Sequence, residues 1–198
     1  MQKIFNISLP RTGTQSIHKF LQSAGYNSMH WIGNYVDIES MVPPRATIDD
    51  LFNLMSNFDD KFDAFNDTPY NILHEHYAKK YPNAKFILVT RRFEDWLESK
   101  SSFNKKVIEK MTPLQKLFYS GYGSNNIDDL NFSYQVSVDQ YKNIYDNHIE
   151  RCLSFFSNNN NFIHVGLNDN SISSKLSNFF NLNHEIQLSN IDFLKRIG

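Results

Sequence analysis

The chain alternates between short β-type runs and longer segments with helical periodicity. Residues 85–90 (KFILVT) are apolar on both faces, as expected for a central parallel strand. Residues 14–24 place their apolar side chains on one helical face, and Gly25 ends that segment. Strands are predicted at residues 3–9, 26–31, 62–66, 85–90 and 162–165. This alternation predicts an α/β fold in which helices cover both faces of a parallel sheet.

Several further segments carry a helical pattern. Helices are predicted at residues 48–57, 69–81, 93–103, 133–157 and 173–180. Pro69 suits the first turn of its helix, because a helix start does not need its missing N–H. An apolar stripe from Val138 to Phe156 makes residues 133–157 one long amphipathic helix. Residues 34–45 are predicted to form a loop, and residues 104–133 to hold one or two helices.

Length and composition indicate a single domain spanning residues 1–198. With 198 residues and a hydrophobic fraction of 40%, the chain can bury a core of its own. With a formal net charge of -1, the chain lacks the excess of basic residues that is typical of nucleic-acid-binding proteins. Cys152 is the sole cysteine, and no apolar run is long enough to span a membrane. We therefore expect a cytoplasmic protein with no disulfide, no membrane span and no nucleic-acid partner.

The first candidate site is the loop between the strand at residues 3–9 and the following helix. Residues 8–16 (SLPRTGTQS) combine a glycine, several hydroxyl groups and Arg11. The first turn of a helix leaves backbone N–H groups without partners at the positive end of its dipole, so an oxyanion fits there. The alternative is an ordinary turn in which Thr14 caps the helix. No lysine follows Gly13 and the first glycine of a Walker A loop is missing, which argues against an ATP-dependent kinase.

The second candidate site follows the strand at residues 85–90. Arg91 ends this strand and Ser99 lies two helical turns further on, so both side chains can face one groove. The alternative is that Arg91 and Arg92 are solvated while Trp96 packs in the core. Ligands bind at the carboxyl edge of a parallel sheet, which is where both candidate sites are expected.

Together, the two motifs resemble those of the sulfotransferases that use 3′-phosphoadenosine-5′-phosphosulfate (PAPS). Residues 10–14 (PRTGT) match that family's loop for the 5′-phosphosulfate, and Arg91 with Ser99 matches its 3′-phosphate site. Residues 161–182 resemble its late strand and helix. The resemblance implies a P-loop NTPase-like, three-layer α/β/α fold with a central parallel sheet. It also implies sulfuryl transfer from PAPS to a hydroxyl or amine of a small-molecule or glycan acceptor, with release of adenosine 3′,5′-bisphosphate (PAP).

The resemblance also assigns roles to individual residues. Arg11 would contact the phosphosulfate and stabilise charge at its bridging oxygen. The phosphate would lie against Thr12, Gly13, Thr14, Gln15 and Ser16. Arg11 stands where the cytosolic branch of the family carries lysine, and an arginine cannot give a proton to the leaving group.

Transfer also needs a group that takes the acceptor's proton. Asp67 is the first candidate, because it follows a short strand and should reach the same sheet edge as Arg11. Its Asp-Thr-Pro setting also resembles the family's; the alternative role is a helix N-cap. His30, at the end of the second predicted strand, is the next candidate. No metal is expected, because the histidines of the His-Glu-His run at residues 74–76 would point apart on a helix.

Two other functions are compatible with these motifs. One is a P-loop phosphotransferase that uses ATP or another nucleotide with Mg²⁺, and the other is an inactive relative that binds the nucleotide without turnover. The acceptor is expected to lie against residues 31–57 and 104–133, whose aromatic residues either form an apolar wall of the acceptor site or, for most of them, pack in the core. Those aromatic residues are Trp31, Tyr35, Phe118, Tyr119 and Tyr122.

Overall fold

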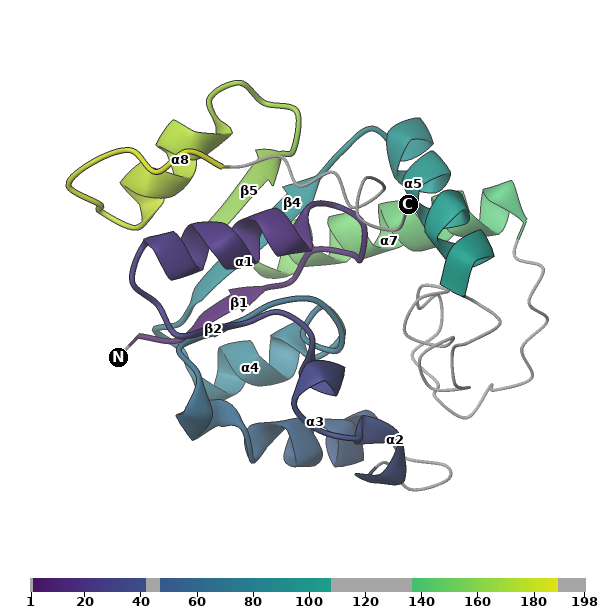
Figure 1. Ribbon diagram of the computed structural model, residues 1–198, viewed down its shortest axis with the longest axis horizontal. Helices are drawn as coiled ribbons and strands as arrows, with labels where there is room; N and C mark the ends of the chain where they lie inside the picture. Colours follow the sequence, from purple (N-terminus) through teal and green to yellow (C-terminus); the bar gives the residue numbers. More distant parts are fainter. Residues whose placement is uncertain (1, 42–46, 108–136, 189–198) are drawn as a thin grey trace.

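Five short parallel strands form one central sheet. The computed structural model describes residues 2–41, 47–107 and 137–188. The strands are β1 (Ile4–Asn6), β2 (Ser28–Met29), β3 (Ala64–Phe65), β4 (Lys85–Thr90) and β5 (Phe162–Gly166), in the spatial order β2-β3-β1-β4-β5 (Figure 1). In the register of the sheet, Phe5 of β1 lies opposite Phe65 of β3 and Phe86 of β4. The parallel sheet confirms the predicted α/β fold, although β1, β2 and β3 are shorter than predicted.

Helices connect the strands along the chain. They are α1 (Thr14–Ser23), α2 (Ile38–Met41), α3 (Ile48–Ser56), α4 (His74–Lys80), α5 (Phe93–Val107), α7 (Val138–Phe155) and α8 (Ile172–Phe179), with 3₁₀ turns η1 (Ile32–Asn34) and η2 (Asp59–Lys61). Besides shifts of a few residues at helix ends, two details differ from the sequence prediction. Residues 38–41 are helical rather than part of a loop. Pro69 does not begin α4, because the backbone first makes a turn in which Ile72 N donates to Pro69 O at 2.9 Å.

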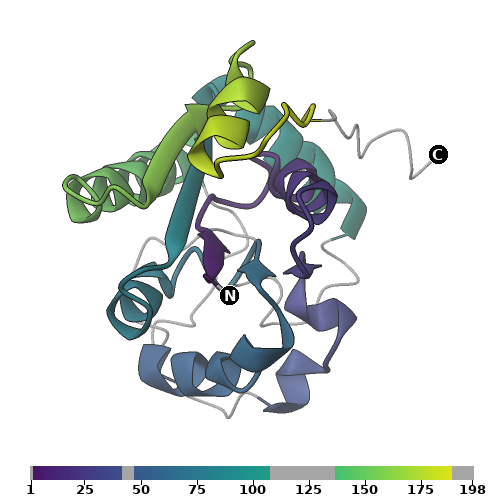
Figure 2. The same cartoon turned by 90° about the vertical axis from the view of Figure 1, so that its left-hand side faces the viewer.

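Successive side chains of each strand point to opposite faces of the sheet. On one face, Ile4 and Ile87 pack with Ile17 of α1 and Leu176 of α8. On the other face lie the side chains that pack against α3, α4 and α7, among them Phe5. Figures 1 and 2 show α1 and α8 on one side of the sheet and α3 and α4 on the other. The chain therefore forms the three α/β/α layers that the resemblance implied.

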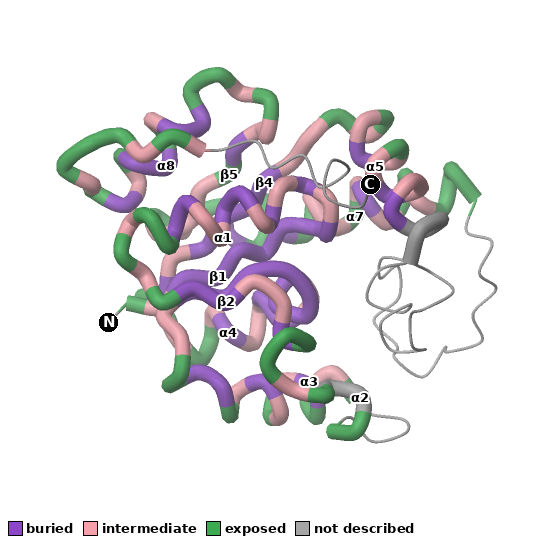
Figure 3. Tube along the Cα trace, in the orientation of Figure 1, coloured by how far each residue is buried: buried purple, intermediate pink, exposed green. Residues whose placement is uncertain are grey.

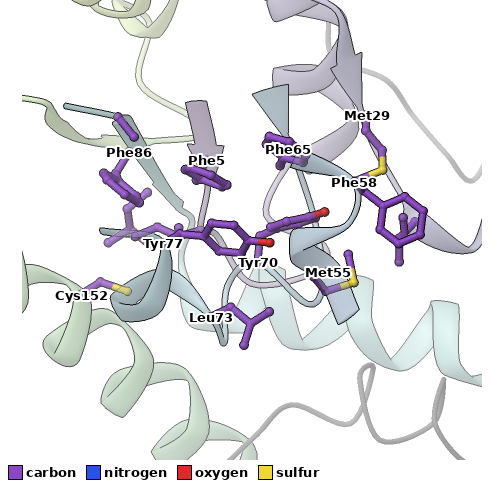
Figure 4. Close-up of a cluster of buried hydrophobic side chains, with 14 of the residues drawn as sticks. Phe5, Met29, Met55, Phe58, Phe65, Tyr70, Leu73, Tyr77, Phe86 and Cys152 are labelled. Carbon is purple, nitrogen blue, oxygen red and sulfur yellow. The ribbon is translucent and has the colours of Figure 1, made fainter. Parts of the chain in front are cut away.

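The second face carries an aromatic core centred on Phe5. Its ring centroid lies 4.4 Å from that of Tyr77, 5.1 Å from that of Phe65 and 5.6 Å from that of Phe86 (Figure 4). All four side chains are fully buried. Packed aromatic side chains bury large apolar areas and hold a fixed geometry. This packing anchors the short strand β1, and so fixes the point from which the next loop departs.

The chain stays buried after β1 ends, which is unusual for a loop. Residues 7–10 are buried, and Figure 3 shows this segment continuing the buried path of β1. Its backbone polar groups therefore need partners inside the protein. Ile7 N donates to Ile87 O at 2.9 Å, and Ser8 N donates to the Oδ1 atom of Asn6 at 3.2 Å. The first of these bonds holds the loop against β4 at the carboxyl edge of the sheet.

Candidate active site

The loop between β1 and α1 turns sharply because two of its residues adopt positive φ angles. Arg11 has φ 73° and Gly13 has φ 96°, a region that favours glycine. Thr12 closes the turn, since its hydroxyl donates to Leu9 O at 2.6 Å. Gly13 is the N-cap of α1, so Thr14 is not the cap and its side chain is available for another contact. The amides of the first turn of α1 thus follow directly after the arginine.

Two contacts from neighbouring elements hold this loop in place. Trp96 of α5 is fully buried, and its indole Nε1 donates to Pro10 O at 2.9 Å. Ser8 Oγ accepts a hydrogen bond from Val89 N of β4 at 2.6 Å. Both Pro10 and Ser8 are therefore tied to the chain segment that also carries Arg91. A loop held by such contacts presents its amides with little conformational freedom, which favours ligand binding.

Arg11, Arg91 and Ser99 lie together at the carboxyl edge of the sheet. Arg11 Nε donates to Ser99 Oγ at 3.2 Å, and Arg91 Nη1 lies 3.4 Å from Arg11 O. The Arg11 guanidinium also lies over the Phe103 ring, 4.9 Å from its centroid. The structure thus brings together the two arginines that sequence analysis assigned to one ligand, although they lie far apart in the chain.

One N–H group of the Arg91 guanidinium could still donate a hydrogen bond to a ligand. Its buried Nε donates to no acceptor among the described residues. A buried donor of this kind is costly unless a ligand or water accepts its hydrogen bond. Guanidinium and hydroxyl groups are donors that suit the oxygens of phosphate groups.

Tyr145 of α7 positions the backbone of Arg91, a role that sequence analysis did not predict. Its phenol oxygen accepts a hydrogen bond from Arg91 N at 3.1 Å, and its hydroxyl donates to Arg91 O. Burial raises the pKa of Tyr145, so the phenol stays protonated and can keep both bonds. The sequence places Tyr145 on the apolar stripe of the long helix, which indicates burial but gives no sign of its partner.

Asp67, His30 and Thr14 form a second group at the same edge. Thr14 Oγ1 lies 3.3 Å from Asp67 Oδ2, to which it donates, and 3.2 Å from His30 Nε2. The same His30 nitrogen lies 3.5 Å from Asp67 Oδ2. The three residues come from the ends of β3 and β2 and from the start of α1. The predicted pair of proton acceptors is therefore in contact, beside the first turn of α1.

The environment of Asp67 differs from that of a helix cap. It has φ 68°, and its Oδ1 accepts a hydrogen bond from Thr68 N at 2.8 Å. Helix α4 begins only at His74, so Asp67 does not cap it. The side chain of Asp67 is 7% exposed, whereas that of His30 is 23% exposed. The Asp67 carboxylate is thus more deeply buried than the His30 imidazole, which is partly exposed to solvent.

A polar network lies next to this group, since the ring centroids of His18 and His30 are 5.6 Å apart. Asn66 Nδ2 donates to Ser28 Oγ at 2.9 Å, and the same hydroxyl lies 2.9 Å from His18 Nδ1. Burial lowers the pKa of His18 to about 4, with the nearby His30 adding to the shift. His18 is therefore neutral near pH 7. It serves as a hydrogen-bond partner of β2 rather than as a charged group in the site.

Lys100 is a further member of the site that sequence analysis missed. It follows Ser99 on α5 and is fully buried. Burial lowers the pKa of its ammonium to about 7; the Asp67 carboxylate opposes this shift and the Arg11 guanidinium adds to it. A signal existed in the sequence, because Trp96, Lys100 and Phe103 recur at helical spacing on one face. A lysine between two inward aromatic residues of an amphipathic helix is unusual.

The remaining predicted residues can also be located. Gln15 and Ser16 lie in the first turn of α1, with Ser16 buried and Gln15 half-buried. Trp31 packs against the aromatic core, whereas the side chain of Tyr35 is 52% exposed. Phe118, Tyr119 and Tyr122 lie outside the described residues, as does most of the segment 104–133. The part of the acceptor side that this segment was expected to form is therefore not described.

Within the described ranges, no group of histidine, cysteine and acidic side chains could hold a metal ion. Among the helices described, none is long and apolar enough to cross a membrane. At the edge of the sheet, cations, backbone amides and hydroxyl groups lie next to a carboxylate–imidazole pair. Such an arrangement can bind an anionic group and accept a proton beside it.

Comparison with known proteins gives two findings. A family model described as "Sulfotransferase domain" matches residues 3–170. The crystal structure of a sulfotransferase from Alicyclobacillus acidocaldarius matches with a TM-score of 0.57 and 12% sequence identity, covering 100% of this chain and 89% of that chain. At this identity the structural match concerns the fold, which it supports independently. A search of curated proteins finds no significant match.

Proposed function

Because this chain belongs to the sulfotransferase family, and is therefore a transferase, we propose that its sulfuryl donor is PAPS. The acceptor would be a hydroxyl or amine of a small molecule or glycan, and the second product would be PAP. One observation carries the proposal. Arg11 and Arg91 extend from the ends of the adjacent strands β1 and β4 and are joined by a hydrogen bond, with Ser99 in contact with Arg11.

The donor would be held at both of its phosphate groups. Its 5′-phosphosulfate would lie against the amides of residues 12–16 at the start of α1, with Arg11 beside the bridging oxygen. Its 3′-phosphate would bind Arg91 and Ser99. Two features of Arg91 support this assignment. Its backbone is held by Tyr145, and its buried Nε can donate a hydrogen bond to a charged acceptor.

The transfer step would be an in-line displacement at sulfur. A bond forms between the acceptor oxygen or nitrogen and sulfur while the bond from sulfur to the bridging oxygen breaks, and its electron pair stays on the leaving phosphate. Arg11 and the amides of α1 would stabilise that charge. The proton of the acceptor would pass to the Asp67–His30 pair, whose nearest atoms are 3.5 Å apart.

Thermal unfolding with added nucleotides tests the identity of the donor. We expect PAP without Mg²⁺ to raise the melting temperature, because all of the proposed contacts come from the protein. At about 100 times its Kd the ligand adds about 2.7 kcal/mol of stability, which corresponds to a shift of roughly 5–10 °C. ATP with Mg²⁺ should give a much smaller shift. The opposite ranking would replace the proposal with a nucleotide-dependent phosphotransferase.

A further inference from the structure

Lys100 is a fully buried lysine that follows Ser99 in the chain. Helix α5 directs Ser99 toward Arg11 and the next residue, Lys100, into the protein interior. Trp96, one turn earlier, is fully buried and fixes the loop through Pro10 O. Lys100 thus comes from the same rigid helix that holds both the loop and Ser99, so its ammonium has a defined place next to the site.

The charged groups that act on Lys100 are the ones that define the site. Asp67, at the end of β3, favours its protonated form, and Arg11, on the loop after β1, disfavours it. Each of these two residues has a further partner, since Asp67 Oδ2 lies 3.5 Å from His30 Nε2 and Arg11 O lies 3.4 Å from Arg91 Nη1. The protonation of Lys100 is therefore balanced between burial and one carboxylate, with a second cation close by.

An anionic ligand would change this balance. Arginine side chains keep their charge at any physiological pH, so Arg11 and Arg91 cannot respond to a ligand by gaining a proton. A lysine can respond, because a nearby negative charge favours its charged form. PAP and PAPS each carry several negative charges next to Arg11 in the proposed binding mode, and so next to Lys100.

We propose that Lys100 is an ionisable part of the donor site, which takes up a proton when the 3′-phosphonucleotide binds and then acts as a second cation beside Arg11. This inference rests on the proposed function, since it needs a ligand with phosphate groups at the edge of the sheet. It adds a residue that the two loop motifs do not contain.

Proton uptake on binding is the quantity that separates this role from a structural one. Isothermal titration of the intact chain with PAP, in two buffers of different ionisation enthalpy, measures it directly. At pH 8 the phosphate groups of the ligand are already deprotonated, while a lysine with a pKa of about 7 is only about one-tenth protonated. We expect an uptake of about 0.5–0.9 proton for each PAP bound, a value that follows from the same pKa.

Substitutions of Lys100 test whether this residue is the group that takes up the proton. Lys100→Met keeps the length of the side chain but cannot titrate, so its uptake should fall to near zero. Lys100→Gln provides a polar alternative if the first variant does not fold, as judged by circular dichroism. Lys79→Met changes an exposed lysine of α4 and should keep the uptake of the unaltered chain. The measurement on the unaltered chain needs no variant and stands alone.

Each outcome decides the matter. Uptake in the unaltered chain and in Lys79→Met, but not in the Lys100 variants, supports the proposal. Binding of PAP without proton uptake, or with uptake that survives in the Lys100 variants, overturns it and leaves the proposed function intact. A complete lack of PAP binding would overturn the proposed function, and this inference with it.

Discussion

Replacing Asp67 with Asn is expected to lower the rate of sulfuryl transfer by about 10²- to 10⁴-fold, the usual contribution of a general base. The carboxylate accepts a hydrogen bond from Thr14 Oγ1 and contacts His30 Nε2, so it can receive a proton directly or through the imidazole. Asparagine keeps the size of the side chain and one accepting oxygen but loses its basicity. The affinity for PAP should therefore change only a few-fold.

The rate is measured as transfer of labelled sulfate from PAPS to the best acceptor in a panel of phenols, sugars, alcohols and amines. Asp60→Asn is the matched control, because Asp60 is exposed and lies away from the sheet edge. His30→Gln should also reduce kcat, and a comparison of the two variants shows which group takes the proton. A variant lacking Asp67 that keeps the full kcat would remove the carboxylate from the mechanism.

Replacing Arg91 with Met is expected to weaken PAP binding by about 10- to 150-fold, since a hydrogen bond to a charged group contributes about 1.5–3 kcal/mol. The loss should depend on the 3′-phosphate. Adenosine 5′-monophosphate lacks that group, so its affinity should fall much less in the same variant. Titration calorimetry with both nucleotides measures the difference.

The neighbouring arginine provides a close control for this experiment. Arg92 is 75% exposed and forms a salt bridge with Asp95 on the surface. Arg92→Met should therefore leave the affinity for both nucleotides close to that of the unaltered chain. If Arg91→Met weakens PAP and the monophosphate equally, Arg91 does not recognise the 3′-phosphate, and that assignment fails.

Local patterns were enough to predict the parts of the site that lie on strong sequence signals. The apolar run at residues 85–90 predicted β4, and its end predicted the position of Arg91. The loop at residues 8–16 was predicted because a strand, a glycine and an amphipathic helix follow one another within a few residues. These features depend on local backbone preferences and hydrophobic periodicity, both of which can be inferred from a single sequence.

The missed features depend on contacts between distant residues. Tyr145 meets Arg91 only because α7 packs beside α5, and a periodic stripe cannot specify a hydrogen-bond partner. Lys100 was overlooked because lysine is usually exposed, although its helical spacing from Trp96 placed it on the inner face. The late start of α4 follows from the turn after Asp67, where backbone bonds override the preference of Pro69 for a first helical turn.

A crystal structure of the chain with bound PAP tests the central claim most directly. We expect one nucleotide whose 5′-phosphate lies against the amides of residues 12–16 and whose 3′-phosphate contacts both Arg91 and Ser99. A nucleotide bound at another edge of the sheet, or one whose 3′-phosphate lies away from Arg91, would contradict the account.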